Sequence, residues 1–196
     1  MYIVHSDHTF WIGKECADFF IEFRDFGIFL SVRQRNISPD KILHVPFYPI
    51  FNDEPFQGFP FDRYGKVVGI SGASLYKYYM DPRLKYFKAI KDLLLLYPNF
   101  RFCLCGMGNS KNVKNFIKNN QLQEKFFYLG KRNDFNQLVA NCDIFFESYP
   151  LKGGLTPLYA TTQKIPIIGM SCYENPSGTI EDFLRIKCYN QATNFD

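Results

Sequence analysis

Residues 143–168 read DIFFESYPLKGGLTPLYATTQKIPII, and their pattern indicates the fold class of the chain. An apolar run begins at Asp143 and predicts a buried strand over residues 143–146. A loop with two glycines follows and leads into a predicted helix over residues 156–163. Pro166 then opens a further apolar run that predicts a strand over residues 166–169. Strand, helix and strand in this order predict parallel strands joined by a right-handed crossover.

The same alternation extends back to Lys66. Strands are predicted over residues 67–70, 100–105 and 126–129, and helices over residues 82–97, 110–119 and 134–141. The first helix has Asp81 as a candidate N-cap and Pro82 in its first turn. One apolar face of this helix is predicted to comprise Leu84, Phe87, Ile90, Leu94 and Tyr97. Continuous apolar strands indicate an α/β fold, a Rossmann-like parallel sheet with helices on both faces.

Residues 1–62 differ in composition from the rest of the chain. They are rich in aromatic residues and end in a Pro- and Phe-rich stretch over residues 46–61. Proline fixes φ and lacks an N–H, so this stretch is predicted to be an extended linker. We therefore divide the chain into a partial N-terminal segment with linker, residues 1–62, and a Rossmann-like domain, residues 63–196.

Composition and charge restrict the class of ligand. Hydrophobic residues make up 46% and charged residues 21% of the chain, as in ordinary globular proteins. The net charge of +4 comes without a Lys/Arg block that could track a phosphate backbone, so nucleic acid is not expected as a partner. A small anionic ligand bound locally fits this charge, and so does a mildly basic solvated surface.

The six cysteines include no Cys-x-x-Cys pair, which argues against a zinc ribbon. Cys103 and Cys105 are expected to share one face of a strand as buried free thiols, in a reducing compartment. The sequence shows no signal peptide and no apolar run long enough to span a bilayer. A cytoplasmic protein is expected, with peripheral association at the inner face of the membrane left open.

Ligands of an open parallel sheet bind beyond the carboxyl ends of the strands, so the loops that follow strands hold the candidate binding residues. The first three such loops contain the following candidates: Gly72 within residues 71–74 with Lys77 shortly after, Gly106 and Gly108, and Gly130, Lys131 and Arg132. Each of these loops, taken alone, is also compatible with an ordinary turn. The Gly-x-Gly at residues 106–108 is an incomplete dinucleotide fingerprint, because Lys111 stands where a third glycine is required.

The fourth loop carries the clearest signal. Residues 152–156, which we call the glycine loop, are Lys152, Gly153, Gly154, Leu155 and Thr156. They are predicted to place backbone N–H groups at a helix start, an arrangement that favours phosphate. Lys152 would add a full charge and Thr156 a hydroxyl. A glycine-rich helix start without a ligand is the alternative.

The segment from Asp143 to Ile168, with its glycine pair before a helix and its Pro before the next strand, resembles the donor-site segment of GT-B glycosyltransferases. The glycines after residues 105 and 129 lie where that family places them, so the resemblance covers residues 66–170. It implies that Gly153, Gly154, Leu155 and Thr156 bind the diphosphate of a nucleotide-sugar donor. It also implies that Lys152 or Lys77 stabilises the leaving group and that Gly130, Lys131 and Arg132 contact the nucleoside, with Gly72, Gly106 and Gly108 also at the donor.

Residues 5–13, together with Asp18 and Arg24, resemble part of the acceptor-side domain of some bacterial members of that family. This resemblance implies that His8 or His5 faces the donor as a general base, because imidazole titrates near neutral pH. A structural histidine beside Trp11 is the alternative.

The chain departs from the family pattern at two positions. Many retaining members carry two glutamates that flank the glycine loop, where this chain has Leu151 and Tyr159. Tyr159 would offer only a hydroxyl to the ribose. No Asp-x-Asp motif occurs, so neither a metal nor a cofactor is expected beyond the nucleotide-sugar substrate.

The resemblance implies transfer of a sugar from a nucleotide-diphosphate sugar to a saccharide acceptor, in the synthesis of bacterial surface polysaccharide such as capsule. A complete GT-B enzyme has two Rossmann-like domains, so a missing domain or a second polypeptide is expected, and the C-terminus is expected to be truncated. Two alternatives stay open: a non-catalytic nucleotide-binding or assembly domain, and an NAD-dependent Rossmann enzyme.

Overall fold

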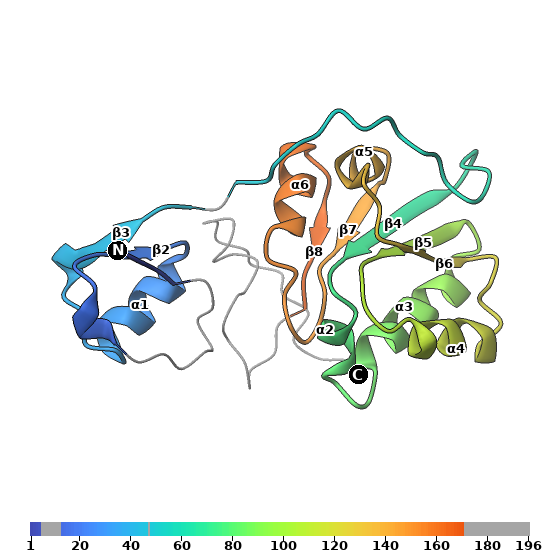
Figure 1. Ribbon diagram of the computed structural model, residues 1–196. Helices are drawn as coiled ribbons and strands as arrows, with labels where there is room; N and C mark the ends of the chain where they lie inside the picture. Colours follow the sequence, from blue (N-terminus) through green and yellow to red (C-terminus); the bar gives the residue numbers. More distant parts are fainter. Residues whose placement is uncertain (5–12, 47, 171–196) are drawn as a thin grey trace.

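The computed structural model describes residues 1–4, 13–46 and 48–170, and His5, His8 and Trp11 lie outside them. Two parallel sheets are present, a small one near the N-terminus and a larger one that follows it (Figure 1). The strands of the larger sheet are β4 (Val67–Gly72), β5 (Phe100–Cys105), β6 (Phe126–Gly130), β7 (Ile144–Phe146) and β8 (Ile167–Ile168). Its helices are α2 (Tyr76–Tyr79), α3 (Lys85–Leu96), α4 (Lys111–Asn119), α5 (Phe135–Ala140) and α6 (Thr156–Thr162).

The larger sheet has the strand order β6-β5-β4-β7-β8, with every pair parallel. The chain starts at the central strand β4, moves outward through β5 to β6, and then returns to lay β7 on the other side of β4. This is the Rossmann-like order expected from the alternation of strands and helices. The predicted α/β fold is therefore confirmed.

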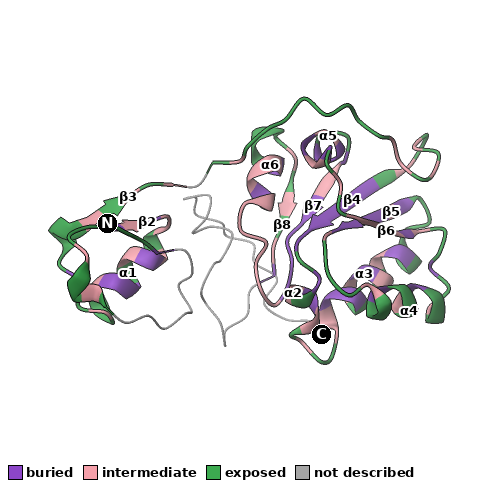
Figure 2. Ribbon diagram, in the orientation of Figure 1, coloured by how far each residue is buried: buried purple, intermediate pink, exposed green. Residues whose placement is uncertain are grey.

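Helices cover both faces of this sheet, as the continuous apolar strands predict. On one face Phe102 and Leu104 pack under α2, α3 and α4, and on the other Cys103 and Cys105 pack under α5 and α6. Figure 2 shows the central strands as the most deeply buried layer of the molecule. The expected buried thiols at Cys103 and Cys105 are thus confirmed, and Cys142 joins them in the same cluster.

The predicted helix over residues 82–97 is too long at both ends. Leu84 has a φ of 51°, a left-handed conformation that starts the helix only at Lys85. Asp81 still accepts hydrogen bonds from the backbone N–H groups of Arg83 and Lys85, at 3.1 and 2.8 Å. Tyr97 was predicted to lie on the buried face, but it follows the helix in extended conformation and is exposed.

A second correction concerns β4. Ser71 and Gly72 were predicted to lie in a loop, but β4 continues through both residues, because they pair with Leu104 and Cys105 of β5. The loop at the carboxyl end of β4 therefore starts at Ala73.

The small sheet has the order β1-β2-β3 and is also parallel. Its elements are β1 (Tyr2–Ile3), β2 (Phe20–Glu22), α1 (Asp25–Arg33) and β3 (Ile42–His44), with short 3-10 helices at Lys14–Cys16 and Pro39–Lys41. Val4, Phe20 and Ile37 form its core. Buried Glu22 is satisfied by the hydroxyl of Ser31, with Arg35 at 4.0 Å.

Residues 48–63, which we call the strap, join the two sheets without helix or strand, as the prolines predict. In Figure 1 the strap runs along the larger sheet past α6 and α5 to the start of β4. It is fastened at its end by Arg63, whose guanidinium contacts both carboxylate oxygens of Asp143 at 2.9 and 3.0 Å. Phe59 and Phe61 stack on each other, and Phe61 packs against Phe127 of β6. The strap thus belongs to the surface of the larger sheet.

In the described part of the chain, no helix combines the length and the apolarity needed to cross a bilayer.

The closest backbone approach in the larger sheet gives a prediction for stability. A Cβ at Gly106 would lie 1.9 Å from the carbonyl oxygen of Ala73, a clash that only backbone movement can relieve. We expect Gly106→Ala to lower the free energy of unfolding by about 3 kcal/mol, as for other overpacked sites. Urea denaturation followed by circular dichroism measures this loss.

Gly65→Ala is the matched control, because Gly65 has a φ of +65° and open space around its Cα. Its cost should be only the conformational one, about 1 kcal/mol. Equal losses in the two variants would contradict the packing role of Gly106.

Candidate functional site

The strand order reverses between β4 and β7, and this reversal creates the candidate site. The chain leaves β4 toward β5 on one side, and it leaves β7 toward β8 on the other. The loops that follow β4 and β7 therefore leave the carboxyl edge of the sheet in opposite directions, and open α/β sheets bind their ligands beside such a reversal. The glycine loop, residues 152–156, belongs to the segment that follows β7.

Gly153 allows the glycine loop to approach the end of β4. A Cβ at this position would lie 2.2 Å from the hydroxyl of Thr156 and 3.1 Å from the carbonyl oxygen of Gly72. Gly154 has a φ of +74°, which favours glycine, and no atom of the described residues lies within 4 Å of the place its Cβ would take. The loop thus needs its first glycine for packing and its second for the turn, and its backbone at Gly154 faces open space.

Lys77 joins the two loops. Its ammonium group donates to the carbonyl oxygen of Lys152 at 2.6 Å, which fastens α2 to the glycine loop. Burial lowers the pKa of Lys77, and the nearby charge of Glu147 raises it in part. Lys77 is thus a partly buried cation held between the loop after β4 and the glycine loop.

Lys152 lies in a different orientation from the one expected. Its ammonium group donates to the carbonyl oxygen of Met170 and lies 3.9 Å from a carboxylate oxygen of Glu147. Only 10% of its side chain is exposed. The side chain of Lys152 is therefore directed into the protein, and its main chain rather than its charge meets Lys77.

Glu147 is a charged residue that the sequence reasoning did not single out. It follows β7 directly, is buried, and its backbone N–H donates to the carbonyl oxygen of Ile168 at 2.9 Å. It supplies the counter-charge beside Lys152. A carboxylate placed at the end of an apolar strand, five residues before a lysine, was the available signal.

The remaining candidate glycines divide into two kinds. A Cβ at Gly72 would lie 2.4 Å from the ring of Phe135, and one at Gly108 would lie 3.3 Å from Leu75, so these two glycines, like Gly106, make room for protein atoms. Gly130 has a φ of +68° and open space around it. The structure gathers the first three glycines at one edge of the sheet as packing positions, while Gly130 and Gly154 present backbone to the surroundings.

A polar pocket lies at the same edge, between the strap and the start of α5. Its volume is about 310 Å³, and it is lined by Ile50, Asn52, Glu54, Lys131, Arg132, Asn133, Phe135, Asn136 and Tyr159. The two cations predicted to contact a nucleoside thus share one pocket. No pattern in the sequence indicates that the strap supplies the opposite wall.

Arg132 lines this pocket with its charge already matched. Its guanidinium contacts the two oxygens of buried Asp134 at 2.7 and 2.6 Å and donates to the carbonyl oxygen of Gly58. Asp134 also accepts a hydrogen bond from the N–H of Gln57. Arg132 therefore holds the strap, and Lys131 is the exposed cation of the pair.

Tyr159 is also engaged with the strap. Its hydroxyl donates to the carbonyl oxygen of Ile50 at 2.7 Å, and its ring packs edge-on against Phe51 and Phe135. Leu151 contributes its carbonyl oxygen to the hydroxyl of Ser148. Neither position that departs from the acidic pattern presents a carboxylate.

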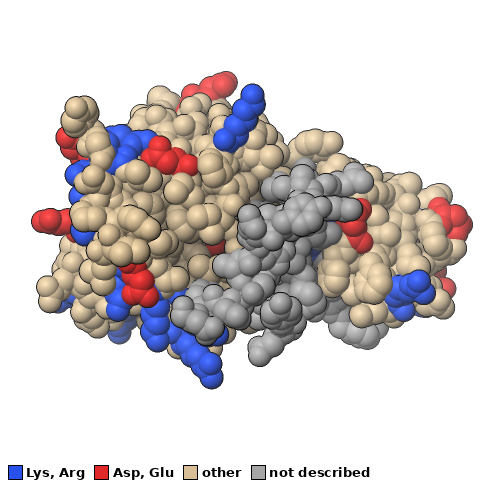
Figure 3. All heavy atoms as spheres, turned by 180° about the vertical axis from the view of Figure 1, so that it is seen from behind, with Lys and Arg blue, Asp and Glu red and all other residues tan. Residues whose placement is uncertain are grey.

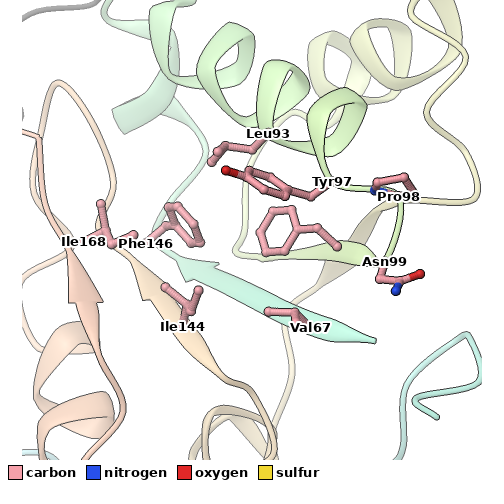
Figure 4. Close-up of a pocket in the computed structure, with 9 residues that line it drawn as sticks. Val67, Leu93, Tyr97, Pro98, Asn99, Ile144, Phe146 and Ile168 are labelled. Atoms are coloured by element: carbon pink, nitrogen blue, oxygen red, sulfur yellow. The ribbon is translucent and has the colours of Figure 1, made fainter. Parts of the chain in front are cut away.

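A larger, apolar pocket of about 410 Å³ lies at the opposite end of the strands (Figure 4). Val67 at the start of β4, Leu93 and Tyr97 at the end of α3, and Ile144 and Ile168 line it. None of its lining residues carries a charge, so it does not suit an anionic ligand.

His8 and His5, the predicted general bases, lie outside the described residues. Within the described part of the small sheet, Nδ1 of His44 lies 3.7 Å from a carboxylate oxygen of Asp25. The described ranges hold no group of three His, Cys, Asp or Glu side chains placed to bind a metal ion. Figure 3 shows the Lys and Arg side chains of one face in small separate groups, with acidic side chains among them.

Comparison with known families gives one match. Residues 53–191 match the profile of the family described as glycosyl transferases group 1. No curated protein sequence matches the chain.

Solved structures share the fold. A TarM variant from S. aureus, in complex with Fondaparinux, alpha-GlcNAc-glycerol and UDP, is 14% identical with a TM-score of 0.64, over 86% of this chain and 36% of that one. The pneumococcal O-GlcNAc transferase GtfA, in complex with UDP and GlcNAc, is 19% identical with a TM-score of 0.61, over 80% and 30%. HepE from Anabaena, in complex with UDP and glucose, is 16% identical with a TM-score of 0.58, over 79% and 44%. The chain spans less than half the length of each of these structures.

The Arg132–Asp134 pair predicts an acid-dependent loss of stability. The hydrogen bonds from Arg132 lower the pKa of Asp134 below its ordinary value of 3.8. The ionised carboxylate therefore stabilises the fold fully above that ordinary value, and this contribution is lost as the pH falls through the lowered pKa. We expect Asp134→Asn to lower the free energy of unfolding by about 3 kcal/mol at pH 7, because it leaves a buried cation unmatched.

Denaturant titrations from pH 7 down to pH 2 measure both effects. The difference between the two proteins should shrink at the acid end. A variant with Asp92→Asn, an exposed helix position, is the control. A difference from the wild type that stays constant with pH would contradict the assignment.

Proposed function

We propose that this chain, which belongs to the group 1 glycosyl transferases, binds a nucleotide-diphosphate sugar on its larger sheet and donates the sugar to a saccharide acceptor. The single observation that carries this proposal is the junction of Lys77 with the main chain of the glycine loop at the reversal between β4 and β7. It sets a cation beside the backbone of the two glycines at the edge where such sheets take their ligands.

The diphosphate would lie over the glycine loop, against the backbone of Gly153 and Gly154. Lys77 would stabilise the charge that develops on the leaving diphosphate as the bond to the sugar breaks. Fixed cations aimed at developing charge are the largest usual contribution in such reactions. Because the ammonium group of Lys152 is turned toward Glu147, we assign the phosphate-facing charge to Lys77 and a loop-shaping role to Lys152.

The nucleoside would occupy the polar pocket beside the strap. Gly130 offers open backbone and Lys131 an exposed cation at this place. The three compared structures contain UDP, which makes a uridine nucleotide the first ligand to test.

The saccharide acceptor would meet the donor from the side of the N-terminal segment, residues 1–62, with His8 as general base. The division into that segment and a donor domain over residues 63–196 is part of this proposal. We further propose a role in surface polysaccharide synthesis at the cytoplasmic face of the membrane, with a further domain or a second polypeptide completing the acceptor site. The compared proteins include a complex of GtfA with GtfB, which is a precedent for two-chain assemblies of this fold.

A second candidate function is nucleotide binding without transfer. Leu151 and Tyr159 favour it, because neither can supply the carboxylates that flank the glycine loop in many retaining members. Release of sugar or its transfer, measured with UDP-sugars and with an acceptor supplied, separates the two functions: binding without either reaction supports this second candidate.

Calorimetric titration with UDP tests the site. We expect Lys77→Met to weaken UDP binding by about 2 kcal/mol, the size of a charge-assisted hydrogen bond to phosphate. The exposed helix residue Lys114 gives the control Lys114→Met, which should bind as the wild type does. Unchanged binding in Lys77→Met would remove this lysine from the site.

The pH dependence of UDP binding gives an independent test of Lys77. Burial lowers its pKa from the ordinary 10.5, so its charge is lost at a lower pH than that of an exposed lysine. We expect UDP affinity to decline as the pH rises toward the ordinary value, and Lys77→Met to remove this decline. Calorimetry over a range of alkaline pH measures it, and an identical decline in both proteins would assign the effect to another group.

Gly154→Asp tests the glycine loop itself. It adds a negative charge and a strained side chain where the backbone faces open space, so UDP binding should be lost while the protein stays folded. Gly65→Asp, with a similar positive φ remote from the site, should bind normally. Retained UDP binding in Gly154→Asp would contradict the placement of the diphosphate.

A further inference from the structure

The polar pocket is closed on one side by the strap, and this wall is built by specific hydrogen bonds. The side-chain amide of Asn52 donates to the carbonyl oxygen of Asn133 at 2.8 Å, and the amide of Asn136 donates to the carbonyl oxygen of Asn52 at 2.9 Å. Together with the bond from Tyr159 to Ile50, these contacts fix residues 50–52 against α5 and α6. The strap residues that line the pocket are therefore held in place before any ligand arrives.

Among the residues that line the pocket, Glu54 is the single carboxylate. Its backbone N–H donates to the side-chain oxygen of Asn52 at 3.3 Å, which ties its position to the anchored part of the strap. The neighbouring Asp53 does not line the pocket. The arrangement thus selects one of two adjacent acidic residues.

The hydroxyl of Tyr159 is not available to act in the same way, because its proton is committed to the carbonyl oxygen of Ile50. A carboxylate differs from such a hydroxyl in that both of its oxygens only accept hydrogen bonds. The complementary ligand group is one with two neighbouring donors, and a vicinal diol is that group. Bonds from a diol to a carboxylate are charge-assisted and therefore strong.

We propose that Glu54 accepts hydrogen bonds from the two ribose hydroxyls of the bound nucleotide, so that the strap recognises the ribose. The pocket is at the right place for this role. Tyr159 follows Thr156 by three residues in α6, a rise of about 4.5 Å along the helix, which is a short step from the glycine loop to the pocket. Phe135 and Tyr159 supply the apolar surface beside the sugar ring.

This inference rests on the proposed function, and it adds to it a residue outside the Rossmann-like unit. Glu54 precedes β4 and belongs to the segment that joins the two sheets. The nucleotide would thus be held by the larger sheet at its diphosphate and by the strap at its ribose.

Binding of UDP and of 2′-deoxy-UDP to the full chain tests the proposal by calorimetry. The wild type should bind UDP about tenfold or more tightly than 2′-deoxy-UDP, the effect of one lost charge-assisted bond. Glu54→Ala should weaken UDP binding by a similar or larger factor and bring the two ligands to nearly equal affinity. The matched control, Asp53→Ala, removes the same charge from the next residue and should preserve the preference for UDP.

The outcomes separate the inference from the function on which it rests. If the wild type binds UDP but does not distinguish it from the deoxy form, or if Glu54→Ala keeps the preference, the role of Glu54 is wrong while nucleotide binding stands. If Asp53→Ala loses the preference equally, the effect is one of general charge and the inference is likewise overturned. If the wild type binds neither UDP nor the diphosphates of adenosine, guanosine and cytidine, the proposed function fails together with the inference.

Binding of inorganic pyrophosphate, which lacks a ribose, is the last measurement. Its affinity should be the same in Glu54→Ala and Asp53→Ala, because both remove one negative charge near the site. A selective loss of pyrophosphate binding in Glu54→Ala would show that this carboxylate supports the phosphate region instead of the ribose, and would overturn the proposal.

Discussion

The contact between the glycine loop and the end of β4 is the constraint on which the candidate site depends. A Cβ at Gly153 would lie 3.1 Å from the carbonyl oxygen of Gly72 and 2.2 Å from the hydroxyl of Thr156, so a side chain at this position would crowd both groups. This closeness brings the carbonyl oxygen of Lys152 within reach of Lys77. The next loop is held in the same way, because Gly106 packs on the carbonyl oxygen of Ala73. Because protein interiors are close-packed, a shift in one of these loops would displace the others. The positions of the loops after β4, β5 and β7 therefore depend on each other.

The strap extends this arrangement beyond the sheet. Its fixation uses Arg132, which the resemblance assigns to the nucleoside, and Tyr159, a position that departs from the acidic pattern of the family. The guanidinium of Arg132 is already neutralised by Asp134, so it has little charge with which to bind a ligand. It can instead hold the strap, whose other residues line the pocket. The polar pocket is therefore composite, with walls from residues about eighty positions apart in the chain, as the bonds between Asn52 and both Asn133 and Asn136 show.

The order and type of the helices and strands could be predicted from the sequence, because the spacing of apolar residues and the local composition are properties of a few consecutive residues. The prediction failed at positions whose conformation depends on contacts with residues distant in the sequence. Leu84 has a left-handed φ, and α3 therefore begins only after it. An apolar side chain such as that of leucine does not predict this conformation. Lys152 was expected to face an anion, and it is turned inward because Glu147 and the carbonyl oxygen of Met170 lie there. The acidic residue of the polar pocket, Glu54, lies in a stretch whose prolines indicated only an extended chain.

The sequence alone established the alternation of apolar strands and amphipathic helices, and with it a parallel sheet covered on both faces. It also determined that two glycines follow a strand and precede a helix, since this pattern is written in consecutive residues. Three features became apparent only in the folded chain: β7 lies beside β4, Lys77 meets the glycine loop, and the strap completes the pocket. The physical reason is that these contacts join residues as far as 109 positions apart, and no local pattern specifies which distant groups will satisfy each other.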